Sequence, residues 1–431
     1  MMYRAMPYKV YKKNGTLIHF NENSLELTEI TPMHHALLVD FSKLQSKEDV
    51  MGMHDGNSDV NEAINELVEL GLIGDGAMLQ FETQKWLYPK IRAFRIVLTE
   101  TCNLACIECF VTKHCEKLRV MRKKTLKKVI SECIPYGKEN QITFHFFGGE
   151  PLICFNNIKL AVEMLEQAVL SGNVIQPVYR ITTNLTLLAP EIIAFFAKYN
   201  FRVGVSVDGP KEINDILRVY RDGNGTYDDV ARNYKQLIES EVNTHVLITP
   251  HPKHLNKFSV YLREVLSSFP MRAITINTPF NFETLRWGVP GDQYAKLLVD
   301  AIGIAKGFGV EVDSAASPPL AALSGEMRRE SPCSLSCDQI MASVDPEGNA
   351  SFCAQRWNSA LAVPIEKASL GLHIPLMRTK DCLICEARNI CGGPCPAFQK
   401  ISGYSIDENK CLFMHSLLGE VINNLNLFEI A

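Results

Sequence analysis

The sequence predicts an α/β protein of three parts, in which a parallel sheet of six β/α repeats stands between two smaller domains. In residues 91–310, six short apolar runs alternate with longer amphipathic stretches, as is typical of parallel strands joined by crossover helices. In residues 1–90, a hairpin signal precedes helical patterns, which together indicate a winged-helix-like domain. In residues 311–431 the alternation stops, and eight cysteines lie between Cys333 and Cys411.

The N-terminal domain is predicted from turn and cap residues. Asn14-Gly15 stands between two apolar runs, which is the signal for a type I′ hairpin turn. Thr31 and Pro32 are suited to the cap and the first position of a helix. A further helix is predicted from an apolar stripe with a glycine stop, made of Val60, Ile64, Leu67, Val68 and Gly71.

Six apolar runs are predicted to be the strands of the central sheet. They cover residues 94–100, 142–147, 178–184, 202–208, 244–249 and 273–277. In parallel sheets the chemistry lies at the carboxyl ends of the strands, so the residues just after these runs are candidates for a site. The stretch DSAASPPLAALSG at 313–325 is predicted to be a linker.

Three cysteines follow the first predicted strand in TCNLACIECF: Cys102, Cys106 and Cys109. Three thiols are an odd number for disulfides and one fewer than a closed tetrahedral metal site needs. A cubane iron–sulfur cluster held by three thiolates leaves one iron with an open coordination position, which is the design of a reactive site. A structural zinc site or a disulfide staple is the alternative.

Composition limits the classes of function. The chain has 431 residues and a formal charge of −4, which gives no electrostatic basis for binding nucleic acid. Its N-terminus lacks the apolar core of a signal peptide, and no window approaches the roughly 18 apolar residues of a membrane span. We therefore expect a cytoplasmic protein with no membrane partner. Thiols stay reduced there, so grouped cysteines favour metal binding over disulfides.

The cysteine spacing resembles that of the radical S-adenosylmethionine (SAM) enzymes, and further motifs lie where that family places them. GGEP at 148–151 follows the second strand, TTN at 182–184 ends the third, and SVDG at 206–209 ends the fourth. The resemblance covers roughly residues 91–310 and implies a partial (β/α)6 TIM-like barrel with a catalytic 4Fe–4S cluster on the three cysteines. It implies SAM contacts at Gly148, Gly149, Glu150, Pro151, Thr183, Asn184, Ser206, Asp208 and Arg218.

The implied roles differ along this set. GGEP would contact the amino group of the methionine part, TTN would lie near the ribose, and Arg218 would pair with the carboxylate. Two positions depart from the family pattern. Glu108 stands where an aromatic residue often precedes the third cysteine, and Leu185 stands where a glycine usually follows the asparagine.

The C-terminal cysteines resemble the SPASM extension of radical SAM enzymes that act on peptides and proteins. The resemblance implies two auxiliary 4Fe–4S clusters, one on Cys333, Cys337, Cys353 and Cys395 and the other on Cys382, Cys385, Cys391 and Cys411. Zinc is the alternative, because paired cysteines are common zinc ligands. Ala354 follows Cys353 where sulfatase-maturing relatives carry an aspartate base, which argues against oxidation to formylglycine.

In this family context, residues 1–90 resemble a recognition element for ribosomally made, post-translationally modified peptides (RiPPs). Such an element binds the leader segment of a precursor peptide, which adds a strand to an open sheet edge. A domain that only packs against the barrel is the alternative. The resemblance also implies a small electron-transfer protein of flavodoxin or ferredoxin type as reductant.

The implied reaction is a reductive cleavage of SAM that yields a 5′-deoxyadenosyl radical, which removes hydrogen from an unactivated carbon of the bound peptide. With the auxiliary clusters accepting an electron, a thioether or carbon–carbon cross-link is the predicted product. Oxidation or epimerisation of a residue without a cross-link is one alternative. A non-catalytic iron–sulfur or zinc scaffold that binds a peptide is another.

Overall fold

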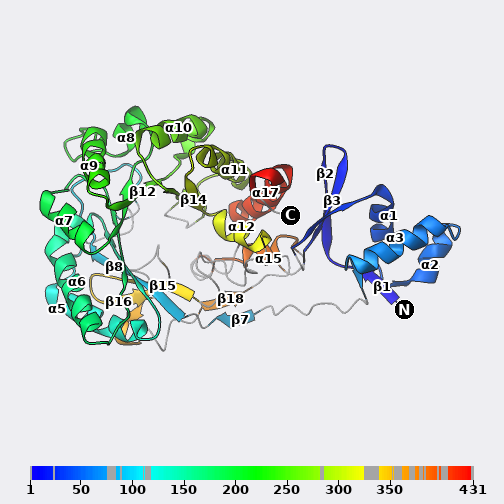
Figure 1. Ribbon diagram of the computed structural model, residues 1–431, viewed down its shortest axis with the longest axis horizontal. Coiled ribbons are helices and arrows are strands. Elements are labelled where there is room, and N and C mark those ends of the chain that lie inside the picture. Colours follow the sequence, from blue (N-terminus) through cyan, green and yellow to red (C-terminus); the bar gives the residue numbers. More distant parts are fainter. Residues whose placement is uncertain are drawn as a thin grey trace.

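The described part of the chain spans all three regions. The computed structural model describes residues 2–22, 25–74, 84–87, 90–109, 111, 118–281, 286–324, 339–351, 353, 362–367, 374–377, 382, 385–395, 398 and 406–428. The sheet and its helices lie at one end of an elongated molecule and the N-terminal domain lies at the other (Figure 1). C-terminal segments lie between them, and the last helix ends near the middle.

One large sheet carries the central region. Its strands are β8 (Lys90–Thr99), β9 (Thr143–Gly148), β10 (Val178–Thr183), β11 (Arg202–Ser206), β12 (Asn243–Ile248), β13 (Ala273–Ile276), β14 (Glu311–Ser314), β15 (Gln339–Val344), β16 (Asn349–Ser351) and β17 (Val363–Pro364). The order is β14-β13-β12-β11-β10-β9-β8-β15-β16-β17. Neighbours are parallel from β14 to β15 and antiparallel from β15 to β17. All six predicted strands are confirmed, as β8 to β13.

Amphipathic helices cover the outer face of this sheet (Figure 1). They are α5 (Lys123–Cys133), α6 (Phe155–Leu170), α7 (Pro190–Lys198), α8 (Lys211–Leu217), α9 (Tyr227–Glu239), α10 (Phe258–Ser268) and α11 (Gly291–Gly307). In α5, for example, Leu126, Val129 and Ile130 are buried, whereas the lysines between them are exposed. Burial of such stripes against strand residues forms one continuous core.

The described part of the N-terminal domain has two three-stranded sheets, of order β5-β1-β6 and β2-β3-β4, and three helices. Its elements are β1 (Met2–Ala5), β2 (Tyr8–Lys13), β3 (Thr16–Asn21), β4 (Leu27–Ile30), α1 (Pro32–Asp40), β5 (Gln45–Ser46), α2 (Lys47–Met53), α3 (Ser58–Glu69) and β6 (Ile73–Gly74). The predicted turn is confirmed, because Asn14 and Gly15 have φ of 50° and 91°, as a type I′ turn requires. The Thr31 hydroxyl caps α1 by accepting from the His34 N–H at 3.1 Å.

The predicted stripe of α3 is wrong at one position. Val68 is 39% exposed, while Ala63 takes the buried place between Val60 and Ile64. At 100° per residue Val68 turns to the edge of the apolar face, and the small core of this domain is already filled by the other residues of the stripe.

The predicted linker at 313–325 is also wrong. Its first residues belong to β14, which extends the parallel sheet beside β13, and a helix follows, α12 (Ser317–Leu323). The Pro-Pro pair that suggested a linker lies in the first turn of α12, where backbone N–H groups have no helical partner to lose.

The remaining C-terminal elements pack on the barrel and on the N-terminal hairpin. They are β18 (Ile374–Met377), which pairs with β7 (Gln84–Leu87), and α15 (Arg388–Cys391), α17 (Glu408–Asn423) and α18 (Leu425–Phe428). Helix α17 lies against α11 so closely that a Cβ on Gly291 would stand 1.9 Å from the Asn409 carbonyl oxygen. The Asp407 carboxylate caps α17 and also accepts from the Trp287 N–H at 2.9 Å.

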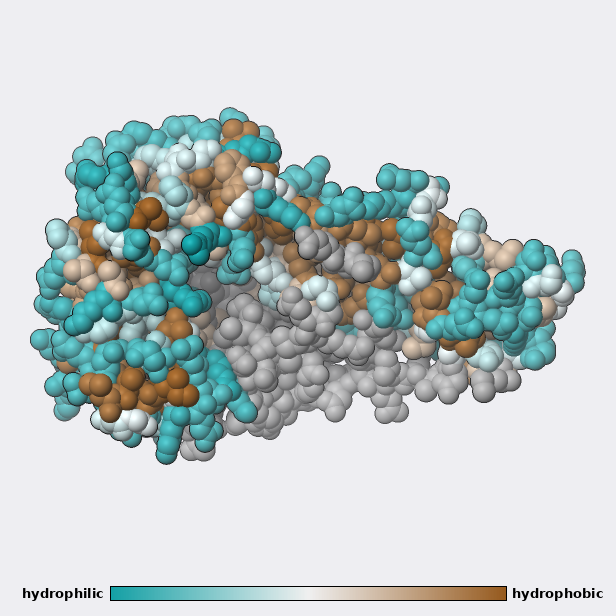
Figure 2. Space-filling model, in the orientation of Figure 1, coloured by the Kyte–Doolittle hydropathy of each residue, from teal (hydrophilic) through white to brown (hydrophobic). Residues whose placement is uncertain are grey.

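The β2–β3 hairpin joins the N-terminal domain to the rest of the molecule. Ile18, Phe20 and Leu25 are buried in the main core rather than in the domain's own core. Apolar atoms gather between the two ends of the molecule, where this hairpin lies against α17 (Figure 2).

Within the described ranges, none of the helices combines the length and the apolar character needed to cross a membrane.

Candidate functional site

The cysteine loop begins directly after β8 and is held by the segment that follows α8. The Ala105 N–H donates to the Val219 carbonyl at 2.8 Å, and the Ile107 N–H donates to the Leu217 carbonyl at 3.0 Å. The Arg221 guanidinium donates to the carbonyl oxygen of Cys102 at 2.8 Å. The loop therefore leaves the strand end in a fixed path. Sequence reasoning did not identify these partners.

The three predicted cluster ligands lie together on this loop. Burial raises the pKa of the Cys102 thiol to about 12, and the charges of Glu150, Cys106 and Cys109 add to the effect. Burial also raises the pKa of Cys106, while the nearby Arg218 lowers it. Thiols that raise one another's pKa in this way share a small volume. A metal centre that stabilises thiolates fits this donor set, because it supplies the positive charge that the apolar surroundings lack.

The two glycines of GGEP allow β9 to meet the cysteine loop backbone to backbone. The Gly149 N–H donates to the Thr99 carbonyl at 2.8 Å, and the Glu150 N–H donates to the Thr101 carbonyl at 2.9 Å. A Cβ on Gly148 would lie 2.1 Å from the Thr99 oxygen, and one on Gly149 would lie 2.3 Å from the Thr101 oxygen. Any side chain here would displace the backbone that leads into Cys102.

Glu150 links the GGEP and TTN motifs. Its carboxylate is fully buried and accepts from the Leu152 N–H at 2.9 Å, the Thr183 hydroxyl at 2.8 Å and the Asn184 N–H at 2.7 Å. Burial raises the pKa of Glu150 to about 7, although these three hydrogen bonds oppose the shift. Pro151 opens a short 3₁₀ turn, Pro151–Cys154, that turns the chain into α6.

Asn184 reaches the cysteine loop. Its amide nitrogen lies 3.6 Å from the Cys102 sulfur and donates to the side-chain oxygen of Asn103 at 3.0 Å. Leu185, which follows it, has φ of 61° and is fully buried. A left-handed leucine costs about 1–2 kcal/mol, which burial of its side chain offsets. The backbone here thus keeps the shape that glycine allows, while leucine adds to the core.

Asp208 and Arg218 form an ion pair beside the cysteine loop. The Arg218 Nε donates to an Asp208 carboxylate oxygen at 2.7 Å, and the other oxygen accepts from the Thr249 N–H at 2.9 Å. Ser206 ends β11 on the same rim. No described residue contacts the two Nη groups of Arg218 within hydrogen-bond distance. The arginine is therefore oriented by Asp208 while part of its fork can still bind a carboxylate.

Arg119 anchors the end of β8 to the C-terminal region, a role that sequence reasoning missed. Its guanidinium donates twice to the fully buried Glu100 carboxylate, at 2.9 and 2.7 Å. It also pairs with Asp345 at 3.2 Å and Glu347 at 2.9 Å, in the turn between β15 and β16. Glu100 stands two residues before Cys102, so this ion-pair group fixes the start of the cysteine loop.

Replacing Arg119 with methionine is expected to lower the free energy of unfolding by about 3–5 kcal/mol, because the buried Glu100 charge loses its partner. Urea denaturation measures this. Lys128→Met is the matched control, since Lys128 pairs with Glu366 on the open surface and should change little. Equal stability of the two variants would contradict the anchoring role.

The inner wall of the barrel is basic. Arg95, His145, Arg180 and Arg202 are paired in register across four neighbouring strands, and they alternate with the core residues under the helices. His145 bonds to the Thr182 hydroxyl at 2.9 Å, and burial, followed by the nearby arginines, holds its pKa well below the usual range. The signal for this wall was a single basic residue with an apolar residue on each side in four of the predicted strands.

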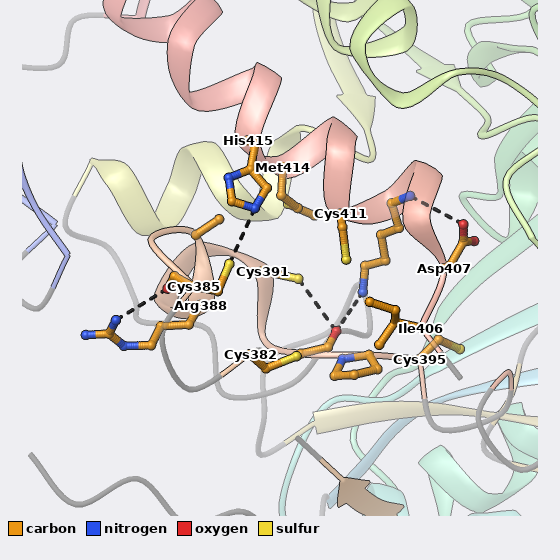
Figure 3. A pocket seen from close by; sticks show the side chains of 14 residues that line it. Cys382, Cys385, Arg388, Cys391, Cys395, Ile406, Asp407, Cys411, Met414 and His415 are labelled. Carbon is orange, nitrogen blue, oxygen red and sulfur yellow. Dashed lines mark hydrogen bonds between the residues drawn. The ribbon is translucent and has the colours of Figure 1, made fainter. Parts of the chain in front are cut away.

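Four of the predicted auxiliary ligands meet in one pocket between α15 and α17. The sulfurs of Cys382, Cys385, Cys391 and Cys411 point toward a shared space (Figure 3). Burial raises the pKa of Cys411 to about 12, and the charges of the other three thiols raise it further. Cys395 stands apart from them at the edge of the pocket (Figure 3).

The other predicted auxiliary set is only partly within the described ranges. Cys333 and Cys337 lie outside them. Cys353 follows β16, where its N–H donates to the buried Ser351 hydroxyl at 3.2 Å, and its charge acts on Arg95 of the inner wall. Across the described residues, no three or more His, Cys, Asp or Glu side chains surround a point that a single metal ion could occupy.

A buried ammonium group faces the four-cysteine pocket. Lys410 is 8% exposed, and its Nζ donates to the Gly393 carbonyl at 2.9 Å. Its charge lowers the pKa of the neighbouring Cys411. A buried cation next to four thiols fits an anionic group held by thiolates. A 4Fe–4S cluster is such a group, and four sulfurs around a common space are suited to hold it.

Comparison with known proteins agrees with the barrel geometry. Residues 96–257 match the radical SAM superfamily. The matched segment contains the three cysteines of the loop and the motifs on the next three strand ends. The predicted α/β fold of radical SAM type is confirmed.

Three related proteins illustrate the likeness. The cysteine-type anaerobic sulfatase-maturating enzyme of Clostridium novyi is 26% identical over 175 residues, which are 38% of this chain and 46% of that protein. The structure of anSMEcpe with bound AdoMet has a TM-score of 0.62 at 18% identity and covers 79% of this chain and all of that one. Streptococcus suis SuiB, solved with its precursor peptide SuiA, has a TM-score of 0.52 at 13% identity and covers 95% of this chain and 100% of that one.

The two structural likenesses show the fold alone, because the sequence identities are only 18% and 13%. The match covers 56% of the length of a Methanocaldococcus jannaschii protein, 74% of that of an Archaeoglobus fulgidus protein and 46% of that of the Clostridium novyi enzyme.

Proposed function

We propose that this protein is a radical SAM enzyme that modifies a ribosomally made peptide. The observation that carries the proposal is the meeting of three thiols, GGEP, TTN and the Asp208–Arg218 pair at the carboxyl ends of four neighbouring strands. In a parallel sheet this rim is where ligands bind. The proteins with similar folds include one solved with AdoMet and one solved with a precursor peptide.

Cys102, Cys106 and Cys109 would hold a 4Fe–4S cluster, and the GGEP, TTN and Asp208–Arg218 groups would hold SAM. Bound there, the cluster and SAM supply a carbon radical that can remove hydrogen from an unactivated position. The chain's own part is positioning. Arg218, oriented by Asp208, would bind the carboxylate through its remaining Nη groups, and Glu150 would face the amino group.

SAM affinity is expected to fall as the pH drops from 8 to 6. The raised pKa of Glu150, about 7, means that the carboxylate becomes neutral over this window and stops attracting the ammonium group of SAM. One pH unit below the pKa, the weakening reaches up to about tenfold. Calorimetry on cluster-loaded protein at pH 6, 7 and 8 measures it, with Glu150→Gln as control. A wild-type profile as flat as that of the glutamine variant would contradict the role of Glu150.

We further propose two auxiliary 4Fe–4S clusters in a SPASM-type C-terminal domain. Cys382, Cys385, Cys391 and Cys411 would hold one, which their shared pocket and the buried Lys410 support. Cys333, Cys337, Cys353 and Cys395 would hold the other, and the separate position of Cys395 in Figure 3 supports this division.

The proposed division of the chain is 1–90 for recognition, 91–310 for the barrel and 311–431 for the auxiliary clusters. A leader segment would add a strand to the sheet of the first part, where β4 is an end strand. A flavodoxin or ferredoxin type protein would supply electrons. The β2-β3-β4 sheet, the three helices and the likeness of 95% of the chain to SuiB support the recognition role.

The proposed product is a thioether or carbon–carbon cross-link within the peptide. We do not assign the reaction of the sulfatase-maturating relatives to this chain. Ala354 follows Cys353, where the resemblance to those enzymes predicts an aspartate base. Oxidation or epimerisation of a peptide residue without a cross-link is a further outcome that the same site could produce.

The test is anaerobic reconstitution with iron and sulfide, followed by SAM and dithionite. The proposal predicts that the protein releases 5′-deoxyadenosine and that it contains the iron of three clusters. A peptide-binding scaffold would load metal yet release no 5′-deoxyadenosine, and that result would overturn the proposal. Where a short open reading frame lies beside this gene, the peptide that it encodes should lose two hydrogens by mass spectrometry if a cross-link forms.

A further inference from the structure

A series of hydrogen bonds connects the N-terminal domain to a cysteine of the auxiliary pocket. His415 on α17 lies with Nε2 3.5 Å from the Cys385 sulfur (Figure 3). Its Nδ1 lies 2.7 Å from a carboxylate oxygen of Glu386. The same oxygen accepts from the ammonium group of Lys9, which stands on β2. Lys9, which is 377 residues from Glu386 in the chain, is thus connected through Glu386 and His415 to one sulfur.

The two acceptors in this series each call for a donor on His415. An ionised carboxylate has only acceptors, so Lys9 and an Nδ1–H of His415 would donate to Glu386. A sulfur that ligates iron has lost its proton and only accepts, so an Nε2–H would donate to Cys385. His415 has both N–H groups in its protonated form, in which it is the cationic partner of Glu386 in an ion pair. Glu386 is 15% exposed, while Lys9 and His415 are 43% and 39% exposed, so the two bonds lie at the edge of the buried turn.

The N-terminal domain has a second contact on the same turn. Glu22, just after β3, pairs with Arg388 at 2.6 Å, and both side chains are almost fully buried. Arg388 also donates to the Cys385 carbonyl oxygen at 3.3 Å, and the Asn389 amide donates to the Glu22 carbonyl oxygen. The turn that carries Cys385 is therefore held by polar contacts from the β2–β3 side, while Ala387 and Ile390 pack into the main core.

We propose that Lys9, Glu386 and His415 form a link by which the N-terminal domain tunes the reduction potential of the cluster that Cys385 helps to hold. This inference rests on the auxiliary cluster of the proposed function. A hydrogen bond donated to a ligand sulfur stabilises the reduced cluster, which carries one more negative charge, and so raises its potential. All three are positioning residues. His415 touches the ligand Cys385, Glu386 orients His415, and Lys9 holds Glu386.

The link has a consequence for peptide binding. A leader segment on β4 would act on β2 through β3, with which both strands pair, and a movement of Lys9 would change the support of Glu386 and the hydrogen bond to Cys385. Binding and reduction are then coupled, and the coupling is reciprocal, so that the oxidation state of the cluster changes the affinity for the peptide.

The experiment is a redox titration of the full-length reconstituted protein, followed by electron paramagnetic resonance. The signal to follow is one that does not respond to SAM and is lost in Cys411→Ser. His415→Phe should make its midpoint potential more negative by about 59 mV, which corresponds to about a tenfold change in the reduction equilibrium. His415→Gln, which keeps one N–H donor, should restore part of the shift.

Lys9→Met and Lys12→Met are the matched pair on β2. Both remove a lysine charge, but Lys12 is exposed and alternates with Lys9, so it points to the opposite face of the strand. Lys9→Met should shift the potential in the same direction as His415→Phe, and Lys12→Met should not. In the His415→Phe background, Lys9→Met should add nothing, because the link is already cut.

Two results would overturn the inference while leaving the proposed function intact. One is a His415→Phe variant that contains the full iron of the auxiliary clusters and has the wild-type midpoint potential. The other is a Lys9→Met shift of the same size with and without His415, which would mean that the lysine charge acts through space. Loss of the auxiliary signal from the wild-type protein would instead remove the proposed cluster itself, and the inference with it.

Discussion

Replacing Cys102, Cys106 and Cys109 together with alanine is expected to abolish SAM cleavage. The three thiols lie beside Asn184 and Arg218, and the proposed cluster with its open iron position for SAM would depend on them. Release of 5′-deoxyadenosine under dithionite should fall below detection. Iron should drop by one cluster's content, since the auxiliary cysteines lie on other elements.

Cys133→Ala is the control for this variant. Cys133 is fully buried on α5 and packs in the main core, so its loss should leave both iron content and SAM cleavage at the wild-type level. Cleavage that persists in the triple variant would show that the cluster loop had been assigned to the wrong cysteines.

Replacing Gly149 with alanine is expected to lower both stability and activity. The new Cβ would lie 2.3 Å from the Thr101 carbonyl oxygen and 2.9 Å from that of Glu100, and backbone cannot move aside as a flexible side chain can. The structure must shift where the cysteine loop begins. We expect a loss of about 3 kcal/mol in the free energy of unfolding. SAM cleavage should fall about a hundredfold, because a displacement of about 1 Å at a reacting site has that effect.

Gly52→Ala is the matched control. Gly52 lies in α2, where a Cβ meets nothing within 4 Å, so alanine should leave stability unchanged or slightly higher. Chemical denaturation and the 5′-deoxyadenosine assay test both variants. If Gly149→Ala has the same stability and activity as Gly52→Ala, then the close approach of β9 to the cysteine loop does not require a glycine at position 149.

Local chemistry made much of the fold predictable. The turn at Asn14-Gly15 and the cap at Thr31 are set by a few adjacent residues, and the six strands follow from short apolar runs. The linker prediction at 313–325 failed because Pro-Pro serves equally well in a loop and in the first turn of a helix. The prediction that Val68 belongs to the buried stripe failed because helical periodicity does not show how large the domain core is.

The candidate site was predictable as a set of motifs but not as a set of contacts. Spacing after a strand selects Cys102, and the neighbouring strand ends select Glu150 and Asn184, since parallel strands place their ends on one rim. Nothing in the sequence pairs Arg119 with Asp345 or Lys9 with Glu386, because such pairs depend on packing between segments that are hundreds of residues apart.

The position of β15 has a consequence for how the chain is made. β15 pairs in parallel with β8, although Ala342 and its partner Phe94 are separated by most of the chain. During synthesis, one edge of β8 therefore stays open until the ribosome has passed residue 344, and an open edge can pair with other chains. The strand that leads into the cysteine loop is thus among the last to be closed on both sides.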